Sequence, residues 1–317
     1  MKSRFTAPTV TLLSLATLLL VGGRLRAERA AGDLSKLTVG TLTREYLLHV
    51  PKDLPEDMAL PLVFVFHGGN GLAFGTMNLT KFNDVADRGQ FLVVYPQGIG
   101  RSWNDGRVTR VSQAHRDNVD DLGFFDALLA EISKTHRIDP KRVFATGISN
   151  GGIFSHFLAA NRAEKLAAIA PVVGGIAVPF NEKFKPARPV SVLVIQGAND
   201  PLVPYGGGKV AGGDGEDRGS VIATTGTIKL WVAANGCAPA AGSFLLPDKD
   251  PADECRTEVT QWKGGRDGTE VRLYRVQGGG HTWPEGAQYL PEFLIGKVTR
   301  DFGSADIWEF FKAHPKP

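Results

Sequence analysis

One serine in this chain of 317 residues stands in a pattern that suits nucleophilic catalysis. Ser149 is the central residue of GISNG, at residues 147–151, after the apolar stretch RVFATG and before the helical pattern GGIFSHFLAAN. A Gly-x-Ser-x-Gly sequence is common by chance. A strand before it and a helix after it, however, predict a nucleophile elbow, a sharp turn that exposes the serine hydroxyl. The alternative is a serine that only caps the helix.

The residues around this serine suit such a turn and supply hydrogen-bond donors. Side chains at Gly147 and Gly151 would collide with the adjacent strand and helix, where the backbone is strained. The backbone N–H of Asn150 lies at the start of a helix, where it can donate to a developing oxyanion. We expect a second donor from the loop after LPLVFVFHGG, namely the backbone N–H of Gly69 or Asn70.

A serine hydroxyl needs a base that takes its proton, and seven histidines are available. His281 follows the buried-type strand VRLYRVQ and three glycines, on a loop that must fold back over the strand ends, so we predict it as the base. His67 ends the first central strand, where it would orient the following loop. The other histidines have positions typical of surface or packing residues: His49, His115, His136, His156 and His314.

The base in turn needs an acid, which fixes its tautomer and stabilises the imidazolium. Asp200 follows the strand VSVLVIQG closely and lies between the serine and the histidine in sequence. The order Ser149, Asp200, His281 is the one that α/β-hydrolases use. Asp120 and Asp121 compete for this role, but they open a helix, where capping explains them. We therefore predict Asp200 as the acid.

Strand and helix patterns alternate along the chain. Apolar runs typical of strands buried on both faces alternate with amphipathic patterns typical of helices. This alternation predicts an α/β fold with a mostly parallel central sheet and helices on both faces. The strand patterns are LTVGTLTREYLLHVP (a hairpin), LPLVFVFHG, FLVVYP, RVFATG, AAIAPVV, VSVLVIQG and VRLYRVQ; the helical patterns cover residues 77–88, 119–136, 151–161, 220–235 and 304–313.

In such a sheet the ligand crevice lies beyond the carboxyl ends of the strands. We expect Trp103, Trp283 and His67 to line this crevice, the tryptophans as flat apolar walls. The alternative for each tryptophan is to anchor its loop. Two long connections, residues 97–118 and 204–220, are expected to cover the crevice.

The sequence contains no convincing cofactor or metal motif. Gly208-Lys209 lacks the hydroxyl residue that follows the lysine of a phosphate loop, so nucleotide binding is not expected. The second connection contains three acids that could hold calcium, Asp214, Glu216 and Asp217. A solvated acidic loop is the favoured interpretation. We predict neither a metal nor an organic cofactor.

The first residues form a separate segment. Lys2 and Arg4 precede an apolar run of about a dozen residues, followed by small residues near position 27, which is the layout of a signal peptide. A membrane anchor is the alternative, but the run is shorter than the roughly 20 residues that span a bilayer. We predict a signal peptide at residues 1–27, one catalytic domain at 28–317, secretion, and no stable membrane partner after cleavage.

Removal of residues 1–27 takes away four basic residues and no acidic one, so the net charge changes from +3 to −1. A near-neutral chain without a lysine and arginine cluster excludes nucleic acid as an expected partner. The two cysteines, Cys237 and Cys255, form an even pair in a chain expected to be exported, so we predict one disulfide, with two free thiols as the alternative.

From residue 37 onward the chain resembles the polyhydroxybutyrate depolymerase and feruloyl esterase branch of the α/β-hydrolases, in carbohydrate esterase family one. The motifs that carry this resemblance are VFVFHG, VVYPQG, SWNDG, DDLGFFDALL, RVFATGISNGG, QGANDPLVPYGGG and GGGHTWP. The resemblance implies an α/β-hydrolase fold and a secreted serine esterase with the triad Ser149, Asp200 and His281. In family members the second cysteine often lies just before the final strand. This chain has WKGG at that place, residues 262–265, and its Cys255 lies earlier.

The resemblance also implies the substrates, which are acyl or hydroxycinnamoyl esters of plant polysaccharide or short polyester chains. Two other functions compete with ester hydrolysis. A serine peptidase can use the same fold, although no propeller or cap domain that selects peptides is recognisable here. A carbohydrate-binding protein that has lost catalysis is the second, and the complete set of predicted catalytic residues argues against it.

Overall fold

A ten-stranded sheet runs through the part of the chain that the computed structural model describes, residues 34–52, 54, 58–212, 216–240 and 242–317. Its strand order is β1-β2-β4-β3-β5-β6-β8-β13-β12-β11. The strands are β1 (Ser35–Val39), β2 (Leu42–His49), β3 (Leu60–Phe66), β4 (Leu92–Gln97), β5 (Ile138–Ile148), β6 (Ala168–Val172), β8 (Ser191–Gly197), β11 (Ser243–Leu245), β12 (Arg256–Trp262) and β13 (Val271–Gln277).

The centre of the sheet is parallel and its two edges are antiparallel. Strands β4, β3, β5, β6, β8 and β13 pair in parallel, whereas β1 and β2 on one side and β12 and β11 on the other pair antiparallel. A second, three-stranded sheet has the order β7-β10-β9, from β7 (Ala177–Val178), β10 (Ser220–Val221) and β9 (Gly208–Lys209).

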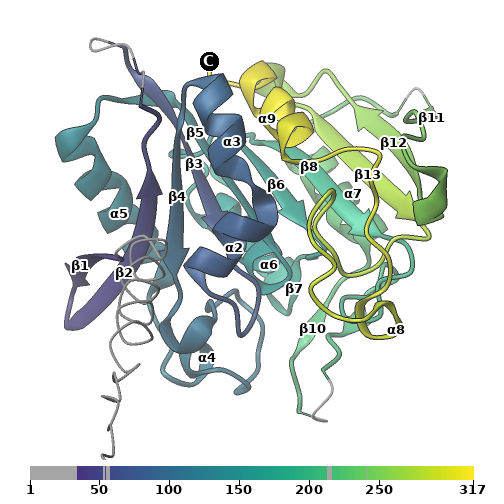
Figure 1. The fold of residues 1–317 in the computed structure, drawn as a ribbon, viewed down its shortest axis with the longest axis horizontal. Helices are drawn as coiled ribbons and strands as arrows, with labels where there is room; N and C mark the ends of the chain where they lie inside the picture. The colour runs from purple at the N-terminus through teal and green to yellow at the C-terminus, as the bar shows by residue number, and fades with distance from the viewer. Residues whose placement is uncertain (1–33, 53, 55–57, 213–215, 241) are drawn as a thin grey trace, which may run out of the picture. The chain divides into compact units, whose positions relative to one another are not determined.

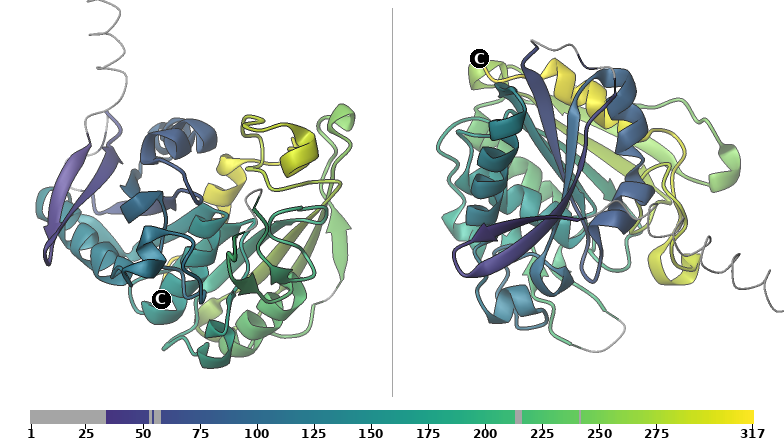
Figure 2. Two further views of the ribbon diagram at one scale, coloured as in Figure 1. Left: turned by 90° about the horizontal axis from the view of Figure 1, so that it is seen from below. Right: turned by 60° about the vertical axis from the view of Figure 1, so that its left-hand side comes forward.

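Helices cover both faces of the large sheet, as Figures 1 and 2 show. The helices on the two faces are α2 (Ala73–Thr80), α3 (Phe82–Gly89), α5 (Asp121–Thr135), α6 (Asn150–Asn161), α7 (Thr224–Asn235) and α9 (Ser304–Ala313). Two short helices, α4 (Gln113–Arg116) and α8 (Glu292–Ile295), lie in connections. Short 3₁₀ turns complete the connections: η1 (Ile99–Arg101), η2 (Phe180–Lys183), η3 (Pro251–Asp253) and η4 (Arg266–Gly268).

The apolar runs of the sequence become strands because each face of the sheet meets its own layer of helices. Along β3, Val63 and Val65 pack in a core with residues of α2, α3 and α9. Leu62, Phe64 and Phe66 point the other way and pack with residues of α5, α6 and α7. All seven residues of β3 are buried, as expected for a strand with side chains that alternate between two cores.

Strand register brings the predicted site residues to one edge of the sheet. Phe66 pairs with Gly147, so the loop after β3 begins beside the turn that follows β5. Gly197, at the end of β8, pairs with Val276 near the end of β13. Because parallel strands end at the same edge, the loops that carry Ser149, Asp200 and His281 meet there.

The predicted fold class is confirmed, and most predicted elements are present within a few residues. The hairpin at the start of the sheet turns at Gly40, which has a φ of 59°. The single helix expected over residues 77–88 is wrong: Lys81, with φ 52°, divides it into α2 and α3. Strand β12 was not predicted at all.

The predicted disulfide is wrong: Cys237 and Cys255 are both free thiols. Cys255 immediately precedes β12, whereas Cys237 lies near the other end of that strand, where the N–H of Ala238 donates to the carbonyl of Lys263. The seven residues of β12 thus keep the two sulfurs about 20 Å apart along the strand. Burial, with nearby carboxylates, raises the pKa of Cys255 to about 12.

The segment predicted as a signal peptide, residues 1–27, lies outside the described residues. The described residues from Ser35 onward form one compact unit. Within the described part of the chain, every helix is too short or too polar to cross a membrane.

Candidate functional site

Ser149 occupies a strained turn between β5 and α6. Its φ of 58° and ψ of −120° lie in a region that residues other than glycine rarely adopt. Two backbone hydrogen bonds hold this conformation, because Ser149 donates its N–H to Val172 (2.9 Å) and accepts from the N–H of Ile153 (2.8 Å). The hydroxyl makes no capping bond to the helix. The geometry is therefore that of the predicted nucleophile elbow and not of a helix-capping serine.

The glycines around the elbow are required for space. A Cβ on Gly147 would lie 2.7 Å from the carbonyl oxygen of Phe66, and one on Gly151 would lie 2.6 Å from that of His67. Neither glycine has a positive φ, whereas Ser149 does. The backbone strain that we expected at the glycines therefore lies at Ser149. Gly174, which sequence reasoning missed, is equally constrained, since its Cβ would lie 2.6 Å from the backbone nitrogen of Ile153.

Two backbone segments that could supply oxyanion donors lie beside Ser149. Asn150 is the first residue of α6, and the first N–H groups of a helix have no acceptor within the helix. The loop after β3 faces this turn: a Cβ on Gly68 would lie 3.4 Å from the Cβ of Ser149, and one on Gly69 would lie 3.9 Å from that of Asn150. The segment that holds Gly69 and Asn70 thus lies where the second donor was expected.

His281 is paired with Asp200. The imidazole Nδ1 lies 2.8 Å from Oδ2 of Asp200, and both side chains are almost fully buried. The other carboxylate oxygen, Oδ1, accepts the backbone N–H groups of Leu202 (2.8 Å) and Val203 (2.9 Å). Because these bonds fix the carboxylate, its Oδ2 is held toward the imidazole.

The loop that carries His281 is fixed by close backbone packing. A Cβ on Gly197 would lie 2.6 Å from the carbonyl oxygen of Gly279, so only a glycine at the end of β8 lets the two loops meet. His281 donates its N–H to Ile295, and Tyr289 donates its hydroxyl to the carbonyl of His281 (2.6 Å). The segment at residues 289–295 therefore supports the histidine from the far side.

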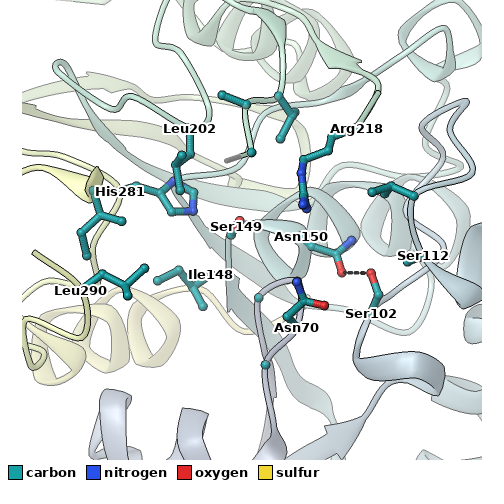
Figure 3. A pocket seen from close by; sticks show the side chains of 18 of the residues that line it. Asn70, Ser102, Ser112, Ile148, Ser149, Asn150, Leu202, Arg218, His281 and Leu290 are labelled. Carbon is teal, nitrogen blue, oxygen red and sulfur yellow. Dashed lines mark hydrogen bonds between the residues drawn. The ribbon is translucent and has the colours of Figure 1, made fainter. Parts of the chain in front are cut away.

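Ser149 and His281 line one pocket of about 890 Å³, and Figure 3 shows the imidazole pointing toward the serine. Two kinds of wall flank the serine. A mainly apolar wall comes from Leu72, from α2 and from residues 289–295, with the further side chains Leu79, Leu290, Leu294 and Ile295 and the hydroxyls of Thr76 and Tyr289. Most other charged and hydroxyl-bearing side chains come from the 97–118 and 204–220 connections, which also contribute Val111 and Val210: Ser102, Arg107, Ser112, Glu216 and Arg218.

Comparisons with known proteins agree on the family. "Probable feruloyl esterase C" of Aspergillus terreus is 30% identical over 210 residues, which cover 63% of this chain and 70% of that protein. The chain belongs to the feruloyl esterase branch of the α/β-hydrolases. "Putative esterase NocK" of Nocardia uniformis subsp. tsuyamanensis is 29% identical over 277 residues, or 86% of this chain and 79% of that protein.

The fold of this esterase agrees with that assignment. A solved acetyl xylan esterase from Aspergillus awamori superposes with a TM-score of 0.57 at 15% identity and covers 89% of this chain and 99% of its own. No family model matches the chain. The chain is a serine carboxylic-ester hydrolase, and its substrates are esters.

Three residues predicted to line the crevice of this esterase are instead buried outside the pocket. Trp103 is fully buried, donates Nε1–H to the carbonyl of His67 (2.9 Å) and packs against Phe66 and Phe154. Trp283 is also fully buried and donates to Ser304 Oγ (3.0 Å). A buried indole N–H needs an acceptor, and each tryptophan has one. Both tryptophans therefore anchor their loops, as the alternative in the sequence analysis expected.

His67 also lies outside the pocket and holds backbone together. Its Nε2 accepts the N–H of Gly98 (2.9 Å), so Nδ1 carries the proton and lies 2.7 Å from the carbonyl of Gly68. Burial lowers the pKa of His67 to about 4, so the imidazole is neutral at neutral pH. This role agrees with the expectation that His67 orients the loop after β3.

His115 and His156 are more deeply buried than their sequence positions indicated. His156 is fully buried on α6, where Trp231 donates to its Nδ1 (3.0 Å) and its Nε2 lies 3.1 Å from the carbonyl of Gly174. His115 bonds Asp105 (3.0 Å) with both side chains buried. No sequence signal separates these histidines from exposed ones, since each lies in an ordinary polar or helical context.

Both long connections contribute to the pocket, as expected. Of the three acids considered for calcium, Asp214 lies outside the described residues. Among the residues that the structure does describe, no three His, Cys, Asp or Glu side chains gather as metal ligands would.

Proposed function

We propose that this esterase removes acyl groups, feruloyl or acetyl, from plant cell-wall polysaccharide, with Ser149, Asp200 and His281 as its catalytic triad. The observation that carries the proposal is the pocket around Ser149, which is apolar on one side and polar on the other. A hydroxycinnamoyl sugar has the same division, since a flat apolar acid is joined to a hydroxyl-rich alcohol.

In the first half of the reaction, His281 takes the proton of the Ser149 hydroxyl as the oxygen attacks the ester carbonyl. The tetrahedral oxyanion is held by the backbone N–H of Asn150 and that of Gly69 or Asn70. His281 then passes the proton to the sugar oxygen, the ester bond breaks, and the acyl group stays on the serine as an ester. The alcohol leaves.

In the second half, a water molecule gives a proton to His281 and attacks the acyl-enzyme. The carboxylic acid leaves, and the proton returns to Ser149. Asp200 keeps Nδ1 protonated, which directs Nε2 to the serine, and it stabilises the imidazolium. The 2.8 Å contact between Asp200 and His281 supports this role.

The apolar wall would receive the aromatic or methyl part of the acid, and the polar wall the sugar hydroxyls. A volume of about 890 Å³ is enough for a feruloyl group together with sugar residues. The names of sequence relatives, among them a feruloyl esterase and a bifunctional acetylxylan esterase/xylanase, support the same substrate class.

A short polyester is the second candidate, favoured by exposed apolar side chains at the same end of the molecule. Phe293 on α8 is 85% exposed, next to pocket-lining Leu290 and Leu294. An apolar patch beside a pocket is typical of a binding surface. A polyester would use this surface, but its two halves have the same chemistry and would leave the polar wall without a partner.

The proposal includes export. Residues 1–27 would act as a cleaved signal peptide, and 28–317 would form the single catalytic domain, which matches a polymeric substrate that lies outside the cell. N-terminal sequencing of protein recovered from an expressing culture tests this part. A mature chain that begins near residue 28 supports it, and a chain that retains Met1 contradicts it.

A substrate panel separates the candidates: methyl ferulate, acetylated xylan, polyhydroxybutyrate film, and a peptide amide, each with purified protein and with Ser149→Ala. We expect hydrolysis of the first two by the unsubstituted protein only. Faster release from the film identifies a polyester hydrolase, and cleavage of the amide alone identifies a peptidase. Retention of acetylated xylan without hydrolysis identifies a carbohydrate-binding protein.

A further inference from the structure

A buried cluster beside Ser149 takes no part in the triad. It consists of Asp105, Arg107 and His115, all from the 97–118 connection, and their side chains are at most 5% exposed. Oδ1 of Asp105 accepts from His115 Nε2 (3.0 Å), and Oδ2 lies 2.7 Å from an Arg107 nitrogen. Such a buried carboxylate is stable only because every lone pair has a donor.

The cluster keeps Asp105 ionised. Burial alone raises the pKa of a carboxyl group, but the charge of Arg107 and the hydrogen bond from His115 outweigh burial, so the pKa of Asp105 lies well below its usual range. Its two oxygens therefore act only as acceptors at neutral pH.

One further donor to Asp105 comes from the elbow itself. The side-chain Nδ2 of Asn150 lies 2.6 Å from Oδ2 of Asp105 and also donates to the carbonyl of Trp103 (3.0 Å). Its Oδ1 accepts from the hydroxyl of Ser102 (2.9 Å) and the N–H of Trp103 (2.8 Å). All four bonds of this carboxamide thus go to residues 102–105, and Figure 3 shows the one to Ser102.

The cluster is in turn tied to the wall of the pocket. Arg107 lines the pocket and donates from its second terminal nitrogen to the carbonyl of Arg218 (2.7 Å). A Cβ on Gly219 would lie 3.1 Å from the Cβ of Arg107, so the 204–220 connection packs tightly on this side chain. Asp105 is therefore bound by side chains of its own connection and of α6, and Arg107 links it to the 204–220 connection. The carboxamide of Asn150 thus binds a carboxylate whose position is fixed.

We propose that Asp105 is a positioning residue for ester hydrolysis, which acts through the carboxamide of Asn150 to aim the backbone N–H of Asn150 at the oxyanion. The inference rests on the proposed function. The carboxamide and the backbone N–H belong to the same residue, so a fixed side chain limits rotation of the peptide that donates. An oxyanion donor is effective only when its direction is set before the reaction, and a shift of about 1 Å costs roughly 100-fold in rate.

Asp105→Asn is the direct test, because an amide has nearly the same shape but only one oxygen that accepts. It cannot serve Asn150, Arg107 and His115 together. We expect kcat for nitrophenyl acetate to fall roughly 10- to 100-fold with KM nearly unchanged, since the bond to the oxyanion forms only in the transition state. Asp301→Asn is the matched control: Asp301 is equally buried and accepts the N–H of Thr257 (2.8 Å), away from the pocket.

Asn150→Ala tests the same coupling even if Asp105→Asn does not fold. This variant keeps the backbone N–H and removes the carboxamide, and we expect a similar loss of kcat. Where both variants fold, the double variant should lose no more than Asn150→Ala alone, because Asp105 acts through that side chain. Wild-type kcat for Asn150→Ala, or additive losses in the double variant, would overturn the proposal.

A readout that needs no carboxylic-ester substrate keeps the inference separate from the proposed function. A nitrophenyl phosphonate transfers its phosphonyl group to an active-site serine: the serine oxygen bonds to phosphorus, the hydroxyl proton goes to His281, and nitrophenolate leaves. The remaining phosphonyl oxygen uses the same donors as the oxyanion. Modification of Ser149, followed by mass spectrometry, should slow in Asp105→Asn by the same factor as kcat. Unchanged labelling would contradict the role of Asp105, whereas labelled protein that is inactive on every ester would contradict the proposed function alone.

Discussion

At the scale of single residues, the site depends on how Asp200 is held. One carboxylate oxygen of Asp200 accepts two backbone N–H groups, and the other faces His281 at 2.8 Å. The aspartate thus has a fixed direction before any substrate binds. Gln196 adds a donor to the same oxygen that faces the histidine, at 3.2 Å.

Asp200→Asn should lower kcat by about 10³–10⁴-fold, because an amide in this place can present N–H to Nδ1 and so favours the wrong tautomer of His281. The backbone bonds to Oδ1 can persist, so the melting temperature should change little. Steady-state kinetics with nitrophenyl acetate and a thermal melt check both parts. Nearly full activity would mean that another acid supports His281.

At the scale of elements, the turn between β5 and α6 depends on backbone packing from β6. The glycine that follows this strand, Gly174, touches both the elbow and the first turn of α6, since its Cβ would lie 2.8 Å from the carbonyl oxygen of Ser149 and 2.7 Å from the backbone of Gly152. Three consecutive elements therefore meet with no room for a side chain.

Gly174→Ala should destabilise the fold by about 1–3 kcal/mol, the usual effect of overpacking, and should lower kcat because the shift falls on Ser149. Gly75→Ala in α2 is the control: nothing lies within 4 Å of its added Cβ, so it should leave the melting temperature unchanged or raise it slightly. Equal melting temperatures for the two variants would show that the packing around Gly174 is loose.

Much of this architecture could be predicted from sequence, because buried strands and strand-end motifs leave local signals. The position of Ser149 follows from the pattern around it. Burial of Trp103 and Trp283 could not be predicted, since their partners are distant in sequence: Trp283 bonds Ser304, and Trp103 packs against Phe154. The pairing of Asp105 with Asn150, 45 residues apart, is equally invisible before the chain folds.

Three other predictions from the sequence were wrong or incomplete. The break at Lys81 depends on a left-handed residue that is not a glycine, for which the sequence gives no warning. Strand β12 mixes polar and apolar residues and lies near the edge of the sheet, so its alternation is weak. The two cysteines were predicted to pair from their even number and the expected export, whereas β12, which follows Cys255, places them near its two ends.

At the scale of the whole molecule, two neutral histidines are built into the interior. Burial lowers the pKa of His156 to about 3 and that of His67 to about 4. In unfolded chains histidine has a pKa of about 6.5. Between these values the unfolded chain binds protons that the folded chain does not, so the free energy of unfolding decreases as the pH falls below about 6.5.

His156→Gln should flatten this dependence, because glutamine can still accept from Trp231 and donate to Gly174 without titrating. We expect the loss of stability between pH 6.5 and 3.5 to shrink by a few kcal/mol, at about 1.4 kcal/mol for each pKa unit removed. Urea unfolding at several pH values measures it. His136→Gln, at the end of α5, should keep the steep profile, and an unchanged profile in His156→Gln would place the acid sensitivity elsewhere.

Ser149 is the proposed nucleophile, and a comparison of two serines in the same region separates its role from that of an ordinary buried serine. Ser155 on α6 is buried and donates its hydroxyl to the carbonyl of Gly151 (2.8 Å), so Ser155→Ala controls for the loss of a serine. We predict that Ser149→Ala lowers kcat for nitrophenyl acetate by about 10⁵-fold or more, while Ser155→Ala keeps activity within about 10-fold. Comparable activity in the two variants would show that Ser149 is not the nucleophile.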